Sequence, residues 1–200
     1  MPILKENSLS YKLDELPIGE LVFLSDYPEY DVAFACRVLA QKCKEGSFVK
    51  LSKGIYYKPV MTKFGPLLPS VDKVVQAVAR RDNARILPSG NAVLNQLGLS
   101  TQVPMRQVYL TSGSARDLDI GGVKITLKRS VPKTFEFHGE LMPLLAQALK
   151  ALGKEGLTSE QAGIIIKLLK KHPEEETFEH DLSLMPAWMQ KVLKQLKTGL

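Results

Sequence analysis

The chain has 200 residues, of which 44% are hydrophobic and 24% charged, a composition that allows one or two folded domains. It excludes the disordered and fibrous classes, and no stretch approaches the roughly 18 consecutive apolar residues of a membrane span. The first residues lack the apolar core of a signal peptide. These features predict a cytoplasmic protein with no membrane partner.

Positive charge is concentrated near the middle of the first half. The chain carries a net charge of +6, and residues 37–63 hold seven lysines and arginines against one acidic residue, Glu45. Such a block attracts polyanions, because neutralised phosphates release their counterions. The charge alone leaves open the alternative of a solvated charged face.

The first elements follow from apolar spacing in chain order. A short helix after Ser8 or Ser10 ends at Pro17, and residues 20–24 form a brief apolar strand. Ser25 and Asp26 begin a short helical turn. A clear amphipathic helix then runs from Asp31 to Gly46, with apolar side chains three or four residues apart. Its two cysteines lie seven residues apart, about 10 Å along the axis, which excludes a disulfide between them.

The other side of this predicted helix is polar and cationic. Its members share one exposed face because they recur every three or four residues: Tyr30, Ala33, Arg37, Gln41 and Lys44. We expect Arg37, Gln41 and Lys44 to face base edges or phosphates of double-stranded DNA, with Tyr30 at the start of the helix.

A β-hairpin follows, with strands over residues 47–51 and 55–58 joined by Ser52-Lys53-Gly54. Helix, strand, short helix, amphipathic helix and hairpin is the order of a winged helix-turn-helix, whose third helix enters the major groove. Lys50, Ser52 and Lys53 would then touch the DNA backbone. Winged helices also bind proteins, so a protein-binding scaffold that uses this domain without DNA stays open.

Residues 59–70 hold three prolines and predict an extended connection between two domains, 1–62 and 70–200. The second domain begins with a helix capped by Ser70, a short strand over 85–87 and a helix after Ser89-Gly90-Asn91. Three strands are expected over 107–111, 116–120 and 123–129, and helices over 141–152, after Thr158 and after Pro186. The predicted fold class is α+β, a winged helix-turn-helix followed by a mixed α/β domain with C-terminal helices.

The spacing of candidate catalytic and metal-ligating residues matches none of the known motifs that we compared. The three histidines, His138, His172 and His180, have no cysteine neighbours, and nucleotide-binding and serine-nucleophile motifs are absent. Asp117 and Asp119 share one face of a predicted strand, where a nuclease could hold Mg²⁺, although alternating surface charge explains the pair more simply. We predict a non-enzymatic protein with no cofactor and no metal, and a metal-dependent nuclease is the rival.

One stretch is dense in small and amide side chains. It reads Pro88-Ser89-Gly90-Asn91-Ala92, then Asn95 to Pro104, then Tyr109-Leu110-Thr111-Ser112-Gly113. These groups suit caps and turns. The stretch resembles the signature of AbiEi-type antitoxins of type IV toxin-antitoxin systems, carried by Ser89, Gly90, Asn91, Asn95, Gly98, Gln102 and Pro104. Residues 54–59 are similar to the end of that family's DNA-binding region, and the resemblance spans roughly residues 20–150.

The resemblance implies a prokaryotic repressor that binds inverted repeats in its own promoter through the winged domain. It also implies that the second domain counters a nucleotidyltransferase-like toxin, directly or indirectly. No catalytic residue of that family carries over to this chain.

Overall fold

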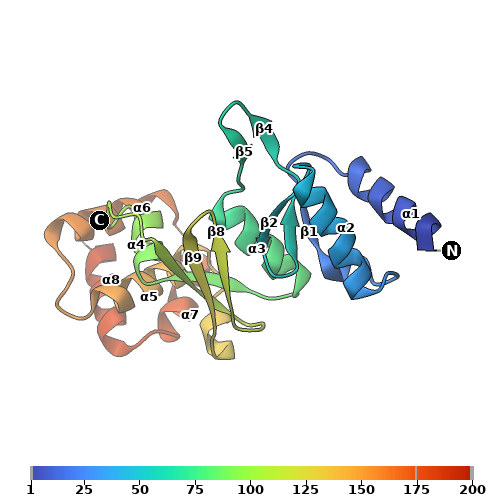
Figure 1. The fold of residues 1–200 in the computed structure, drawn as a ribbon. Helices are drawn as coiled ribbons and strands as arrows, with labels where there is room; N and C mark the ends of the chain where they lie inside the picture. The colour runs from blue at the N-terminus through green and yellow to red at the C-terminus, as the bar shows by residue number, and fades with distance from the viewer. Residues whose placement is uncertain (1, 174, 199–200) are drawn as a thin grey trace. The chain divides into compact units, whose positions relative to one another are not determined.

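The computed structural model describes residues 2–173 and 175–198, and it is a mixed α+β structure with several small sheets (Figure 1). The α+β class predicted from the sequence is confirmed. The chain divides into two compact units, Met1–Val78 with Leu118–Val123, and Ala79–Asp117 with Lys124–Leu200.

The first unit begins with a helix, a strand and a short helical turn, continues with a second helix and ends in a hairpin. In order these are α1 (Pro2–Glu15), β1 (Leu21–Phe23), the 3-10 helix η1 (Leu24–Asp26), α2 (Val32–Lys44), β2 (Val49–Ser52) and β3 (Ile55–Tyr57). The strands form an antiparallel sheet in the order β1-β3-β2, in which Tyr57 lies opposite both Leu21 and Val49. Each predicted element from the first helix to the hairpin is present, and the first helix starts earlier than its apolar spacing indicated.

The core of this unit lies between α1, α2 and the sheet. Leu9 and Leu13, one turn apart on α1, are fully buried against Val38 and Leu39 of α2. Phe48 and Tyr56 close the cluster from the strand side, 1% and 3% exposed. Burying side chains of this size contributes about 1.5–3 kcal/mol each, so this cluster fixes the orientation of α2.

The connection over residues 59–70 differs from the prediction. It contains a second hairpin, β4 (Val60–Thr62) paired with β5 (Gly65–Leu67), before α3 (Val71–Arg81). The Thr62 hydroxyl donates to the Gly65 carbonyl at 2.8 Å and accepts the Phe64 N–H, which organises the turn. Pro66 is tolerated because a two-stranded sheet leaves one side of each strand unpaired. The side chains here are almost all exposed, so no burial pattern signalled the strands.

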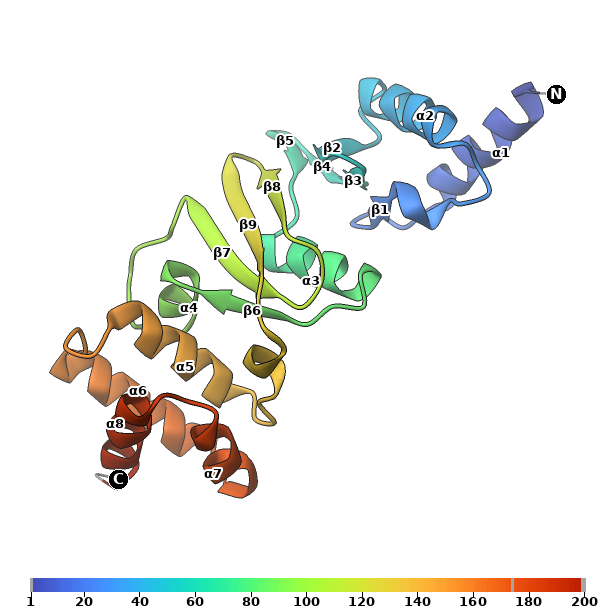
Figure 2. The ribbon, with the colours of Figure 1, turned by 90° about the horizontal axis from the view of Figure 1, so that it is seen from below.

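The second unit is built on a four-stranded sheet of order β6-β7-β9-β8 (Figure 2). Its strands are β6 (Ile86–Ser89), β7 (Arg106–Thr111), β8 (Arg116–Ile120) and β9 (Val123–Arg129), and the hairpin tip at residues 118–123 groups with the first unit. β6 is antiparallel to β7, and β7 is parallel to β9. Helix α4 (Asn91–Gln96) lies between β6 and β7 in the chain, and the 3-10 helix η2 (Pro132–Phe135) follows β9.

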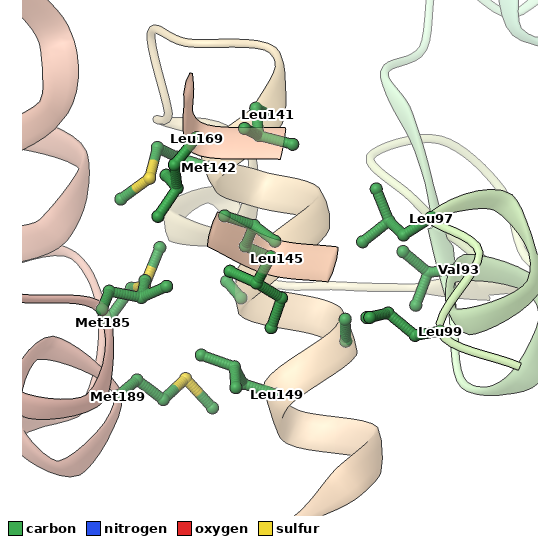
Figure 3. Packing of buried hydrophobic residues seen from close by; sticks show 14 of the residues in the cluster. Val93, Leu97, Leu99, Leu141, Met142, Leu145, Leu149, Leu169, Met185 and Met189 are labelled. Carbon is green, nitrogen blue, oxygen red and sulfur yellow. The ribbon is translucent and has the colours of Figure 1, made fainter. Parts of the chain in front are cut away.

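Four helices complete this unit: α5 (Leu141–Leu152), α6 (Ser159–Lys171), α7 (Glu175–Ser183) and α8 (Ala187–Thr198). α5 is central, and it contacts α4, α6, α7 and β6. In Figure 3, Leu145 and Leu149 of α5 lie between Val93 and Leu97 on one side and Met185 and Met189 on the other. α6 starts with a capping box, because the Thr158 hydroxyl accepts the Gln161 N–H and the Gln161 side chain accepts the Thr158 N–H. The helix α7 was not predicted.

Both cysteines lie in α2 as free thiols, as expected. Within the described part of the chain, every helix is too short or too polar to cross a bilayer.

Candidate nucleic-acid interface

Helix α2 is anchored at its start and buried along one face. Asp31 caps it, and the carboxylate of Asp31 accepts the Phe34 N–H at 3.1 Å. The buried stripe contains Ala35, Val38, Leu39 and Lys42. Ala33, Arg37, Gln41 and Lys44 are all exposed and follow one another along the opposite face, as predicted from their spacing.

The two cations at the ends of this row are available to a ligand. The side chains of Arg37 and Lys44 make no hydrogen bond or ion pair with any described residue. Gln41, between them, donates its amide N–H to Glu45 at 2.9 Å. A ligand at this face would therefore have to compete with Glu45 for this amide, whereas it would meet the side chains of Arg37 and Lys44 unpaired.

Tyr30 stands before the helix and is held by α1. Its ring stacks on Phe34 with centroids 5.9 Å apart, and its hydroxyl lies 3.2 Å from the Ser8 hydroxyl. Lys12 lies 5.3 Å from the ring centroid and bridges to Glu29 at 2.8 Å. This hydrogen bond raises the pKa of Lys12 and lowers the pKa of Glu29. Tyr30 thus joins α1 to the start of α2 while one edge remains at the surface.

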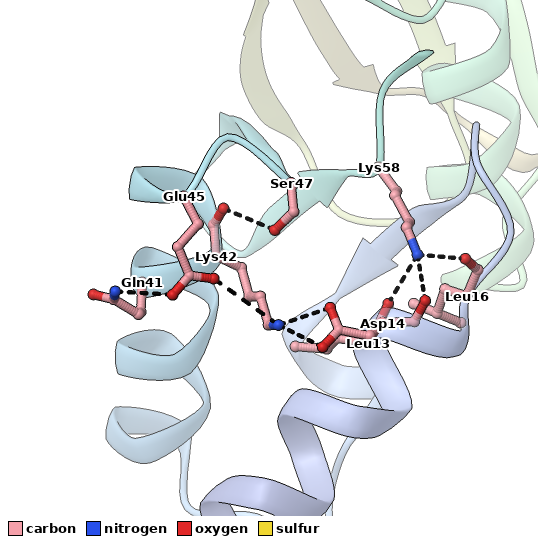
Figure 4. Close-up of polar contacts among 8 residues, drawn as sticks. All are labelled: Leu13, Asp14, Leu16, Gln41, Lys42, Glu45, Ser47 and Lys58. Carbon is pink, nitrogen blue, oxygen red and sulfur yellow. Dashed lines mark hydrogen bonds and ion pairs between the residues drawn. The ribbon is translucent and has the colours of Figure 1, made fainter. Parts of the chain in front are cut away.

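Two lysines of the basic block are structural (Figure 4). Lys42 is 9% exposed and places its ammonium 2.7 and 2.6 Å from the two carboxylate oxygens of Asp14. Lys58 donates to the carbonyls of Asp14 at 2.6 Å, Leu16 at 2.7 Å and, more weakly, Leu13 at 3.4 Å. These carbonyls lie at the C-terminal end of α1, where a cation satisfies otherwise unpaired acceptors.

The remaining five cations of the block are exposed: Arg37, Lys44, Lys50, Lys53 and Lys63. The sequence counts seven cations and one acid in residues 37–63, but only five of these cations are exposed. The count therefore overstates the positive charge at the surface of this region. Burial raises the pKa of the neighbouring Cys43 thiol, although the charge of Lys50 opposes the shift, so Cys43 remains a neutral packing group.

The hairpin carries the other predicted contacts. Lys50 is exposed on β2, Ser52 is half-buried at its end, and Lys53 occupies the exposed turn before β3. Gly54 takes a φ of +75°, a conformation that favours glycine. The turn is thus two residues long, one shorter than predicted, and it leaves the Lys53 ammonium at the surface.

One group of three metal-ligating side chains occurs among the described residues: His138, His180 and Asp181. The two imidazoles stack with centroids 3.9 Å apart and planes 4° apart. A metal ion lies about 2.0–2.1 Å from a ligating nitrogen and in the plane of its ring, so near-parallel stacked rings do not converge on one ion. The sequence did not indicate this cluster, because its histidines are 42 residues apart.

Asp181 has another role in this group. Its fully buried carboxylate accepts the backbone N–H groups of His138 and Gly139, each at 2.8 Å, and lies 3.0 Å from His180 Nδ1. Burial acts to raise the pKa of Asp181, but these hydrogen bonds outweigh it and hold the pKa below its usual value. The cluster ties the loop before α5 to α7.

The candidate nuclease pair, Asp117 and Asp119, lies on the exposed face of β8. Asp117 accepts the Thr126 hydroxyl at 2.7 Å, and Asp119 accepts the Gly122 N–H at 3.0 Å. These contacts pair β8 with β9 and shape the turn that joins them.

The stretch of small and amide side chains, residues 88–113, surrounds α4. Gly90, with φ +60°, precedes the helix, Asn91 begins it, and Gly98, with φ +70°, follows its end. Asn95 donates to the carbonyls of Ser100 and Gln102, both at 3.3 Å. Ser89 donates to the Gln147 carboxamide oxygen at 3.3 Å, and Pro104 is half-buried before β7. These residues close α4 and shape the loop that follows it.

The fold and this surface define an α+β protein of two units whose first unit presents an exposed cationic helix and hairpin. A model described as a family of unknown function (DUF6088) matches residues 8–177, and the chain belongs to this family. A search of curated proteins finds no match.

Proposed function

We propose that this protein is a DNA-binding transcriptional repressor and the antitoxin of a type IV toxin-antitoxin system. In this proposal residues 1–62 form a winged helix-turn-helix, with α2 as the recognition helix and the β2–β3 hairpin as the wing. The element order from α1 to β3 and the sheet order β1-β3-β2 support this assignment.

The observation that carries the proposal is that some basic side chains of the first unit are bound internally, whereas others are exposed and unpaired. The side chains of Lys42 and Lys58 are bound internally. Those of Arg37, Lys44, Lys50 and Lys53 are exposed and make no hydrogen bond or ion pair with any described residue. A helix that keeps its cations free along one face and packs its apolar face on a core suits the major groove. The wing lysines then neutralise phosphates.

The antitoxin role of the second unit rests on the resemblance of residues 88–113. It needs no catalytic group from this chain, and the toxin that the resemblance implies is nucleotidyltransferase-like. Co-expression tests it: growth arrest by a nucleotidyltransferase-like toxin encoded next to this gene should be relieved by the full chain. Continued arrest at equal toxin levels would contradict the antitoxin role.

DNA binding is tested by fluorescence anisotropy with a labelled duplex from the region upstream of the protein's own gene. Lys53→Ala should weaken binding to all duplexes alike and lower the salt slope by about one, since each neutralised phosphate contributes about 0.9. Arg37→Ala should cost about 1–3 kcal/mol and also relax specificity if it reads a guanine.

The matched control is Lys170→Ala, which removes an exposed lysine on α6 whose side chain makes no hydrogen bond or ion pair with any described residue. It should leave affinity and salt slope unchanged. Equal, salt-insensitive binding by wild type, Arg37→Ala and Lys53→Ala would rule out the interface.

The rival function, a metal-dependent nuclease, has a separate test. Mg²⁺-dependent cutting of a plasmid that Asp119→Asn abolishes would favour the nuclease.

A further inference from the structure

A cavity of about 390 Å³ opens between η2, the helix α5 and the segment that joins α7 to α8. It lies within the second unit, and its volume falls in the range of small-molecule sites. Its apolar lining includes Phe137, Met185, Trp188 and Met189. Figure 3 shows Met185 and Met189 directed toward α5. This wall suits a ligand with an apolar body.

One buried polar side chain in the wall is only partly paired. Gln147 of α5 is 8% exposed, and its carboxamide oxygen accepts the Ser89 hydroxyl at 3.3 Å. Its carboxamide nitrogen donates to no described residue. A buried N–H group without a protein acceptor is costly, so this group is available to donate to an acceptor in the cavity.

The charged residues of the wall indicate which kind of acceptor the cavity favours. Among the described residues that line the cavity are two lysines, Lys133 and Lys150, and no acidic residue. Both lysines are exposed, and neither ammonium is bound to a described residue. Gln147 and Lys150 are three residues apart on α5, so they are neighbours on one side of the helix. An anionic group at the mouth would meet a cation and an amide N–H together.

We propose that this cavity binds a small monocarboxylate with an apolar body. The apolar part packs against the methionines and Trp188, and the carboxylate accepts from the Gln147 amide and pairs with Lys150. The site is separate from the proposed DNA contacts, and it stands whether or not the protein binds DNA.

Trp188 makes the test direct, because it is the single tryptophan of the chain and lines the cavity. Decanoate, kept below its micelle concentration, is titrated while Trp188 emission and the heat of binding are followed. A saturable change with one site per chain is expected. Decan-1-ol, which has the apolar body without the charge, should bind about tenfold more weakly, and acetate should not saturate the site.

Variants separate specific binding from surface charge. Lys150→Met should weaken decanoate binding about tenfold and leave decan-1-ol binding unchanged, and Lys170→Met should change neither. Gln147→Met keeps the side-chain volume and should weaken decanoate binding by a similar factor. Its circular dichroism spectrum shows whether it folds, and Lys150→Met decides the outcome if it does not.

Three results would overturn the proposal. The first is a non-saturable signal or several sites per chain, which is non-specific binding. The second is equal affinity for decanoate and decan-1-ol. The third is equal weakening by Lys150→Met and Lys170→Met, which would assign the effect to the general positive charge.

Discussion

Lys58→Met tests whether the residue that follows β3 holds the first helix. The substitution keeps the aliphatic stem and removes the ammonium that donates to the carbonyls of Asp14, Leu16 and Leu13. A hydrogen bond from a charged donor contributes about 1.5–3 kcal/mol, and two of the three are short. Because Lys58 is half-buried, water replaces part of this loss, and we expect about 2 kcal/mol.

The measurement is urea unfolding followed by circular dichroism, with hydrogen exchange to locate the effect in residues 9–15. Each kcal/mol shifts the Tm of a domain of this size by roughly 4–8 °C, so the melting transition should fall by roughly 8–16 °C. Lys53→Met is the control and should change stability by less than about 0.5 kcal/mol. A loss below about 0.5 kcal/mol in Lys58→Met, or an equal loss in the control, would refute the capping role.

Four further substitutions test other features of the fold. Asp14→Asn leaves the buried Lys42 ammonium without its carboxylate and should cost about 1–3 kcal/mol in urea unfolding, while a cost near zero would mean that water replaces the pair. Gly98→Ala forces alanine into a φ of +70° and should lower the free energy of unfolding by about 1 kcal/mol. Gly163→Ala lies inside α6 with open space around it and should raise the free energy of unfolding by about 0.5–1 kcal/mol. The same sign for both changes would contradict the backbone argument. Asp181→Asn should cost about 2–4 kcal/mol near neutral pH. The pKa of Asp181 is lower in the folded state, so its stabilisation is present above the unfolded pKa of about 3.9 and is lost as pH falls through the folded pKa. The free energy of unfolding of the variant should therefore depend less on pH in the acid range. An unchanged pH dependence would assign acid unfolding to other groups.

Local patterns were enough to predict most of the elements. The apolar spacing of α2, the glycines around α4 and the Gly121-Gly122 turn between β8 and β9 each act within a few residues. α7 was missed because Phe178 and Leu182 are its only buried apolar side chains in an otherwise polar segment. The β4–β5 hairpin was missed because its exposed side chains show no alternation.

The candidate sites depend on pairs that are distant in sequence. Arg37 and Lys44 could be assigned to an exposed face from helical spacing alone. The internal role of Lys42 could not, because Asp14 lies 28 residues away. Likewise, the sequence does not indicate that the polar Gln147 is buried, because its burial follows from the packing of α4, α6, α7 and β6 around α5.

The hydrogen bonds from Lys58 to the end of α1 also have a consequence for folding during synthesis. A nascent chain that has emerged only to the end of α2 contains both N-terminal helices but lacks Phe48, Tyr56 and the ammonium that closes α1. Because domains fold as units while the ribosome elongates the chain, α1 docks stably only after the β2–β3 hairpin has left the exit tunnel. Translational pausing before that point would expose Leu9 and Leu13 to chaperones.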